Sequence, residues 1–198
     1  MLEVTAQSDP ELDTADTVDG PHLWYTASRY LALLVAWVAT SGSLFFSEVL
    51  HWIPCSLCWY QRILMYPLSV VLAVGLWRRD PKMHTYVLPF TLAGAAVALY
   101  HYMIQKSDWL APPVCSVGVP CTVDYINWLG FITIPFLALT AFLLINILVL
   151  IAATFTGEPD IDTAVQAAPA WRLDAGRIAV VVIIVGVVLA FVAGAQFV

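Results

Sequence analysis

Four cysteines are the residues of this sequence best suited to chemistry. Cys55 and Cys58 form a C-x-x-C pair in "IPCSLCWYQRILMYPL", and Cys115 and Cys121 form a wider pair in "CSVGVPC". A C-x-x-C ring closes too little chain to constrain the unfolded state much, so such pairs more commonly serve redox or metal chemistry. Three interpretations stay open: a thiol–disulfide relay, a four-cysteine zinc site and two structural disulfides. The wider pair fits zinc spacing loosely, which favours the relay.

The first pair is expected at the start of a helix. Pro54 suits the first helical turn, and the free N–H groups and dipole at that end favour a thiolate. Cys55, Cys58 and Arg62 are spaced i, i+3, i+7 and therefore share one helix face. Arg62 then places a permanent cation about one turn below Cys58, although a snorkelling anchor near the lipid headgroups would use an arginine in the same way.

The composition places the chain in the membrane class. Hydrophobic residues make up 61% of it and charged residues only 11%, against about a quarter in ordinary soluble domains. Five apolar stretches are each close to or above the ~20 residues that a helix needs to cross ~30 Å of hydrocarbon. They run through 30–47, 58–77, 86–104, 128–155 and 178–198. No basic cluster indicates nucleic-acid binding.

The basic residues predict how these helices are oriented, because cytoplasmic loops carry an excess of Lys and Arg. Only Arg62 and Lys106 fall on one side of the expected membrane. The other six basic residues fall on the opposite side: Arg29, Arg78, Arg79, Lys82, Arg172 and Arg177. The N-terminus, which carries an acidic, solvated tail, is therefore expected in the cytoplasm. Both cysteine pairs are expected outside, where disulfides form and persist.

His101 is expected at the same depth as Arg62. Each lies 15 residues from the cytoplasmic end of its helix, or roughly 22 Å at 1.5 Å per residue. Both could donate hydrogen bonds to a polar ring in the membrane, although His101 would also fit an interfacial aromatic belt with Tyr100 and Tyr102. The sequence has no dinucleotide-binding loop, haem-attachment motif or iron–sulfur spacing, which leaves a lipid-soluble quinone as the electron acceptor.

The stretch "FFSEVLHWIPCSLCWYQRILMYPL" closely resembles the DsbB/BdbC family of quinone-linked disulfide oxidoreductases, the BdbC branch in particular. The shared core, a proline followed by C-x-L-C, an aromatic residue and Tyr-x-Arg, occupies residues 54–62. The segments "YHYMIQ" and "CTVDYINWLG" look like the corresponding family segments, and the resemblance covers roughly residues 41–155. The loop cysteines follow the C-x-x-C pair, whereas in the vitamin-K-epoxide-reductase relatives they precede it.

The resemblance implies a role for each cysteine. Cys58 would be the cysteine next to the quinone, and Cys55 its partner that exchanges with the loop pair. Cys115 would form a mixed disulfide with a thioredoxin-like protein, and Cys121 would close the loop disulfide. The residues expected to contact the quinone are Cys58, Arg62 and His101. The spacing between the loop cysteines is shorter than in the enterobacterial branch. The loop cysteines therefore have less freedom to separate and move.

The sequence thus predicts an all-α polytopic membrane protein, with a four-helix transmembrane core and a fifth C-terminal transmembrane helix. The expected parts are an acidic disordered cytoplasmic tail (1–28), a DsbB-like catalytic domain (29–155), a cytoplasmic linker (156–177) and the additional helix (178–198), which we expect to pack or anchor only. The expected function is reoxidation of an extracytoplasmic DsbA/BdbD-like partner with ubiquinone or menaquinone, in a prokaryotic cell membrane. A quinol-linked reductase and a zinc-stapled protein without redox activity are the alternatives.

Overall fold

The computed structural model describes residues 20–107, 119–155 and 175–197. In these ranges the chain is helical apart from short links and one isolated bridge between Trp128 and Ile132. The helices are α1 (Gly20–Leu44), the π-helical turn η1 (Phe45–Val49), α2 (Ser56–Trp77), α3 (Met83–Lys106), α4 (Ile134–Thr154) and α6 (Ala175–Ala195). Five of them, with η1 continuing α1, are long and apolar enough to cross a membrane, so the predicted all-α, multi-pass fold is confirmed.

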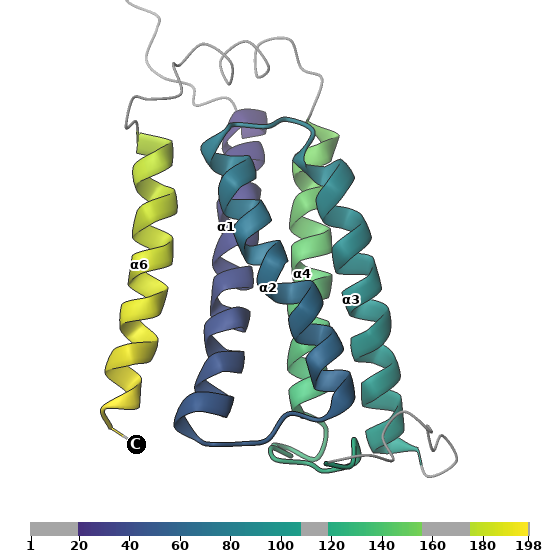
Figure 1. Ribbon diagram of the computed structural model, residues 1–198. Coiled ribbons are helices and arrows are strands. Elements are labelled where there is room, and N and C mark those ends of the chain that lie inside the picture. Colours follow the sequence, from purple (N-terminus) through teal and green to yellow (C-terminus); the bar gives the residue numbers. More distant parts are fainter. Residues whose placement is uncertain (1–19, 108–118, 156–174, 198) are drawn as a thin grey trace, which may run out of the picture.

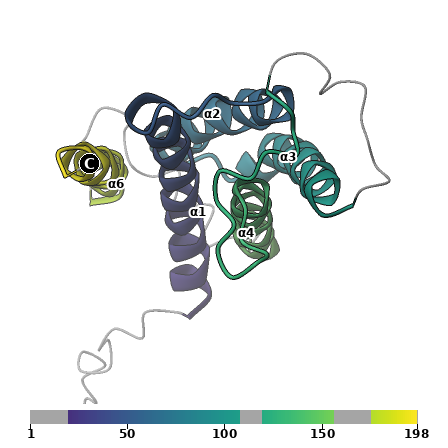
Figure 2. The same ribbon diagram turned by 90° about the horizontal axis from the view of Figure 1, so that it is seen from below.

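Helices α1 to α4 form a bundle in which each packs against its chain neighbour and α4 returns to α1 (Figure 1). Viewed along the bundle, α6 lies outside this group, next to α1 and α2 (Figure 2). The bundle core is built from large aliphatic and aromatic side chains with almost no exposure, among them Leu33, Leu72, Phe142 and Ile145. Gly94 lets α3 approach α4 closely, because a Cβ at this position would overlap the Phe142 ring.

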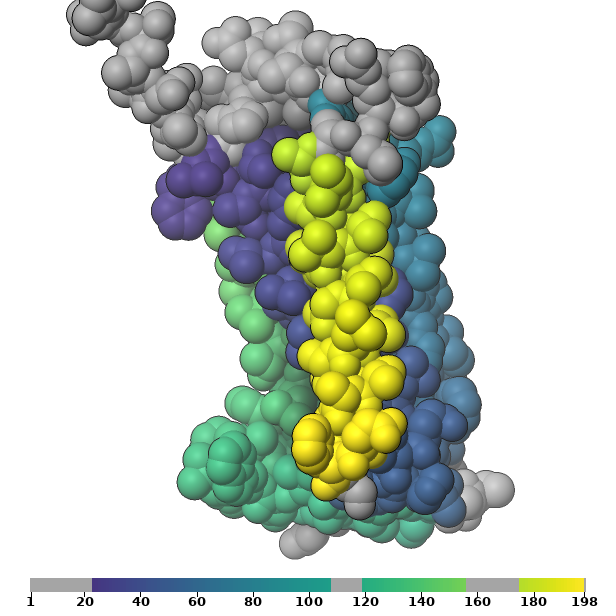
Figure 3. All heavy atoms as spheres, turned by 90° about the vertical axis from the view of Figure 1, so that its left-hand side faces the viewer, coloured from purple at the N-terminus to yellow at the C-terminus, as the bar shows by residue number. Residues whose placement is uncertain are grey.

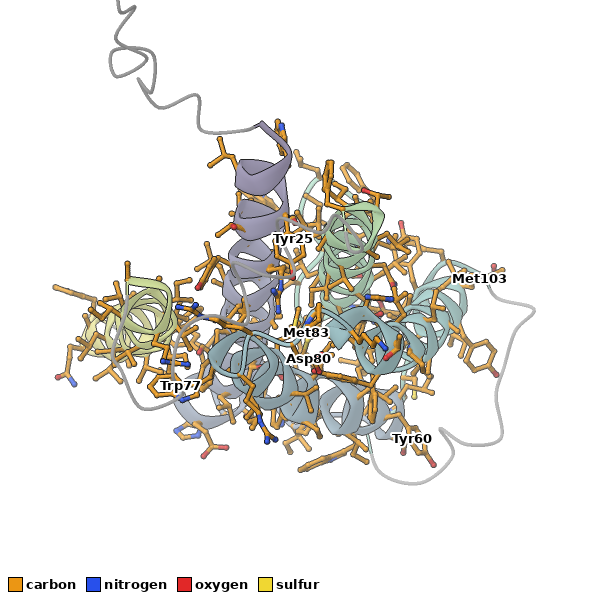
Figure 4. The ribbon with its side chains drawn as sticks, turned by 90° about the horizontal axis from the view of Figure 1, so that it is seen from above. Tyr25, Tyr60, Trp77, Asp80, Met83 and Met103 are labelled. Atoms are coloured by element: carbon orange, nitrogen blue, oxygen red, sulfur yellow. The ribbon has the colours of Figure 1, made fainter. Side chains whose placement is uncertain are left out.

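One end of the bundle gathers basic residues, as the sequence predicts. Arg29 on α1 donates a hydrogen bond of 2.7 Å to the carbonyl oxygen of Asp80 in the α2–α3 link. Arg177 on α6 donates a bond of 3.2 Å to the carbonyl of Trp77 at the end of α2. Figure 4 looks onto this end and labels Tyr25, Trp77 and Asp80 there. The cysteine pair lies at the opposite end, because α2 begins beside Cys55 and ends at Trp77.

Several boundaries differ from those expected, and residues 175–177, expected in the linker, begin α6. Residues 20–28, assigned above to a disordered tail, form the first turns of α1. Tyr25 explains this, because it is 3% exposed, packs with Ala152 and Phe155, and accepts a hydrogen bond from Arg29. The fourth helix begins at Ile134, six residues later than expected, since residues 128–132 form a turn. The expected tail before residue 20 and linker residues 156–174 lie outside the described residues.

Candidate functional site

The cysteine pair is held by the first turn of α2. Cys55 is the N-cap residue, with extended backbone (φ −72°, ψ 172°), and its Sγ accepts a hydrogen bond of 3.3 Å from the backbone N–H of Cys58. A side chain at this position can satisfy one of the free N–H groups of a helix start. Both cysteines are free, and their Sγ atoms are 2.7 Å apart. A small side-chain movement would therefore join them in a disulfide.

Cys55 faces the interior between α2, α3 and the loop that follows α3. It belongs to a buried cluster with Leu57, Ile104 and Cys121. His101 on α3 is 1% exposed, and its Nε2 lies 3.6 Å from Cys55 Sγ and 3.2 Å from the carbonyl oxygen of Cys121. One imidazole therefore contacts both a cysteine of the helix pair and the backbone of the loop cysteine.

Gln61 fixes the protonation pattern of this imidazole. Its Nε2 lies 3.1 Å from Nδ1 of His101. In this amide orientation Gln61 donates, so Nδ1 accepts and the ring proton of the neutral imidazole is on Nε2. That N–H points at the Cys121 carbonyl and at Cys55 Sγ. His101 is thus set to donate a hydrogen bond to a Cys55 thiolate.

These donors hold the pKa of the Cys55 thiol well below its usual range. The largest cause is the hydrogen bond from the Cys58 thiol, followed by His101, and burial opposes both. A thiolate stabilised in this way is the form of cysteine that attacks disulfides. The arrangement therefore prepares Cys55 for thiol–disulfide exchange.

Removing the His101 imidazole should make the Cys55 thiolate less stable. We expect His101→Ala to raise the pH at which the reduced pair loses its first proton by about one unit, because the thiolate loses a donor. The measurement is the thiolate absorbance of reduced minus oxidised protein against pH. His84→Ala, the same change near the other end of α3, is the control. An unchanged titration in His101→Ala would show that the imidazole does not stabilise the thiolate.

Cys58 faces a cavity of about 550 Å³ on the other side of the pair. Its walls come from α1, α2 and α4, with contributions from the α1–α2 link, Tyr125 and Phe191, and they are mostly apolar. The polar side chains next to Cys58 in the wall are Gln61 and Arg62. The cavity is therefore an apolar space with a thiol, an amide and a guanidinium in its wall.

Arg62 is held in place by α1 and by its own helix. Its Nη2 donates a hydrogen bond of 2.9 Å to the carbonyl oxygen of Ser43, and its guanidinium lies 5.5 Å from the centre of the Trp59 ring. Tyr66, one turn further along α2, donates to the Ser43 hydroxyl. These contacts fix a permanent positive charge in the cavity wall, where low dielectric strengthens its interaction with negative charge.

An aromatic stack connects the loop to the cavity. The Trp52 ring lies between Phe46 and Tyr125, with ring centres 5.2 Å and 5.3 Å apart, and the Tyr125 hydroxyl donates to the carbonyl of Ile53. Tyr125 follows Cys121 by four residues and lines both the cavity and a much smaller crevice on the Cys55 side. The loop thus contributes directly to the cavity wall.

The structure brings together three of the four predicted cysteines and separates Arg62 and His101, two of the three predicted quinone contacts. Cys121 is disulfide-bonded and 2% exposed, while Cys115 and its predicted pairing lie outside the described residues. Arg62 lines the cavity, whereas His101 lies behind Gln61 and lines the crevice. Sequence reasoning did not select Gln61 as a site residue. Its position as a strongly polar residue beside Arg62 in an apolar span was the available signal.

The described residues do not assemble a four-cysteine zinc site. Ligand atoms of Cys55, Cys58 and His101 lie within 4.8 Å of one another, which is a three-residue candidate at most. The sulfur separation of 2.7 Å is shorter than the about 3.8 Å implied by two Zn–S bonds of ~2.3 Å at a tetrahedral angle. Cys121 is in a disulfide and so supplies no thiolate.

Comparison with known proteins agrees with the geometry of the cysteine pair. The family model described as "Disulfide bond formation protein DsbB" matches residues 26–195. The chain belongs to the DsbB family. It is 51% identical over 119 residues to disulfide bond formation protein C of Bacillus subtilis, covering 60% of this chain and 86% of that protein. It is 54% identical over 116 residues to a probable disulfide formation protein C of Halalkalibacterium halodurans, covering 58% and 84%.

A third relative, a probable disulfide formation protein C of Bacillus cereus, is 49% identical over 121 residues, covering 59% of this chain and 87% of that protein. No solved structure matches the chain. This DsbB-family member is therefore a disulfide oxidoreductase with membrane-spanning helices, and the predicted family is confirmed. Among the described residues, the cysteine pair is free and Cys121 is disulfide-bonded.

Proposed function

We propose that this protein reoxidises an extracytoplasmic thioredoxin-fold dithiol protein of the DsbA/BdbD type and passes the electrons to a membrane quinone. One observation carries the proposal: the Cys55–Cys58 pair lies between Cys121 and the cavity. Cys55 shares a buried cluster with Cys121, and Cys58, which packs against that cluster, is the cysteine of the pair that also lines the cavity. A pair of neighbouring thiols placed in this way can exchange electrons with both.

The cavity fits a quinone ring in size and chemistry. Its volume of about 550 Å³ falls within the ~300–1,000 Å³ of small-molecule sites, and its walls are mostly apolar with a few polar groups. Arg62 and Gln61 supply N–H donors beside Cys58, which suits a ring that carries carbonyl oxygens. When bound, a quinone would supply an acceptor for two electrons and two protons.

The residues around the cysteine pair have different roles in the proposed reaction. Cys58 presents its sulfur to the cavity, and Arg62 holds a positive charge in the same wall, where it stabilises negative charge on sulfur or oxygen. On the other side, the N–H of His101 stabilises the Cys55 thiolate that forms when the two loop thiols reduce the Cys55–Cys58 disulfide. Gln61 contacts His101 and also lines the cavity, so it holds the imidazole at a fixed distance from it.

The partner is expected to react first at Cys115. Cys121 is 2% exposed, so a bulky partner has no direct path to its sulfur. In the proposed cycle two partner thiols become a disulfide and the Cys115–Cys121 disulfide becomes two thiols. These thiols then reduce a Cys55–Cys58 disulfide and are themselves reoxidised. The reduced pair passes two electrons and two protons to the quinone, which balances the cycle.

The proposed orientation places the site outside the cell. Arg29, Arg177 and the α2–α3 link share one end of the bundle, which the excess of positive charge assigns to the cytoplasm. The cysteine pair is at the other end, in the compartment where disulfides persist. The location is then a prokaryotic cell membrane with an extracytoplasmic site.

The test is anaerobic oxidation of a reduced DsbA-type dithiol protein by the purified chain, with ubiquinone or menaquinone as the only acceptor. We expect one quinol for each partner disulfide, followed by quinone absorbance and by thiol titration. Partner oxidation without quinol would contradict quinone use. Net electron flow from quinol to an oxidised partner would instead identify a reductase.

A further inference from the structure

The fifth helix is the element that the proposed chemistry does not use. Among the described elements it packs mainly on α1, α2 and η1, and much of its surface is exposed (Figure 3). Its buried residues Arg177, Val180 and Val187 continue to the half-buried Phe191 with the i, i+3, i+10, i+14 spacing of one helix stripe. The stripe therefore attaches α6 along the bundle and ends at Phe191, near the end that holds the cysteine pair.

Phe191 is the one described residue of α6 in the cavity wall. Its ring lies over Gly42, where a Cβ would be 3.7 Å from the ring, and it meets Phe45 edge-on with ring centres 6.0 Å apart. Because Gly42 has no side chain, the Phe191 ring of α6 covers this part of α1.

This position is next to the support of Arg62. Ser43 follows Gly42 in the chain, and its carbonyl oxygen accepts the hydrogen bond from Arg62. Gly42, Ser43, Arg62 and Phe191 all line the cavity. Phe191 thus closes the wall beside the cationic group, and its removal would leave that part of the cavity open to lipid.

We propose that Phe191 is a specificity-determining residue of the cavity, through which α6 sets the affinity for the ring of the bound quinone. The inference rests on the proposed function. It gives α6 a role beyond the packing or anchoring expected from its sequence. The three alignments described above are each shorter than the stretch from Cys55 to Phe191. None of them can therefore include both the cysteine pair and Phe191.

The experiment compares Phe191→Ala with Phe197→Ala, the same change at a 90% exposed ring just beyond α6. Binding of a short-tailed quinone to the oxidised protein is measured by quenching of tryptophan fluorescence, because Trp52 lines the cavity. We expect the dissociation constant to rise about three- to tenfold in Phe191→Ala, through lost ring contacts, and less than twofold in the control. Phe191→Leu, which keeps an apolar side chain, should give an intermediate value.

A measurement of loop-disulfide reduction, together with the outcomes below, distinguishes failure of this inference from failure of the proposed function. Partner-dependent reduction of the loop disulfide without quinone should be the same in all three variants, because Phe191 lies on the Cys58 side of the pair. Equal dissociation constants for the wild type, Phe191→Ala and Phe191→Leu would overturn this inference and leave the proposed function standing. Absence of quinone binding by the wild type would overturn both. If Phe191→Ala does not fold, the Phe191→Leu comparison decides.

Discussion

Cys58→Ser should lower the rate of quinone reduction by at least about a thousandfold. The substitution removes the one sulfur of the pair that lines the cavity, and a serine hydroxyl at this position has no base to activate it and no second redox state. The measurement is anaerobic quinol formation with a reduced partner protein. The helix fold should survive, because serine occupies nearly the same space as cysteine.

The same variant should still exchange with the loop. Cys55 keeps its contacts with His101 and with the buried cluster that contains Cys121, so its thiolate can attack the loop disulfide. We expect a mixed disulfide between Cys55 and a loop cysteine to accumulate, detectable by peptide mapping under non-reducing conditions. Ser56→Ala changes a neighbouring residue without touching either thiol and serves as control. Quinol formation above about a tenth of the wild-type rate would show that Cys58 is not the cavity-side cysteine.

The placement of the cysteine pair could be predicted because it depends on short-range geometry. A C-x-x-C pair at a helix start has its sulfurs close together and its N–H groups available, whatever packs around it. The structure has this arrangement at Cys55 and Cys58. Arg62 likewise follows from helical spacing, which places it one turn from Cys58 on the same side, and it lines the same cavity.

The position of His101 relative to Arg62 could not be predicted, because depth along a helix says nothing about the direction a side chain faces. Gln61 and Arg62 are adjacent and point about 100° apart around α2. Gln61 therefore reaches His101 on α3, while Arg62 reaches Ser43 on α1. Only the packing order of the helices shows that the cation and the imidazole lie on opposite sides of the pair.

This separation gives each side of the pair its own electrostatic task. On the Cys55 side, an imidazole that donates one N–H lowers the cost of a thiolate in the buried cluster. On the cavity side, a guanidinium held by a backbone carbonyl supplies a full positive charge. Thiol exchange needs only a modest bias toward thiolate, whereas reduction of an acceptor in an apolar cavity builds up negative charge that needs a cation.

The prediction that follows from this division is a selective loss in Arg62→Ala. We expect the apparent KM for quinone to rise by about 10- to 100-fold, which corresponds to the loss of one hydrogen bond to a charged group. The rate at which a reduced partner opens the loop disulfide, measured in a single turnover without quinone, should stay at the wild-type value. Arg62→Lys should recover only part of the affinity, because an ammonium lacks the planar fork that reaches both Ser43 and the cavity.

Arg78→Ala is the matched control, since Arg78 is the C-cap residue of the same helix at the other end of the bundle. Arg62 also ties α2 to α1 through Ser43, so the thermal stability of each variant must be measured beside its kinetics. A fall in stability with unchanged KM would make Arg62 a structural link between the two helices. An equal loss in quinone affinity and in loop exchange would instead mean that the cation acts on the whole cysteine pair, against the division of tasks described here.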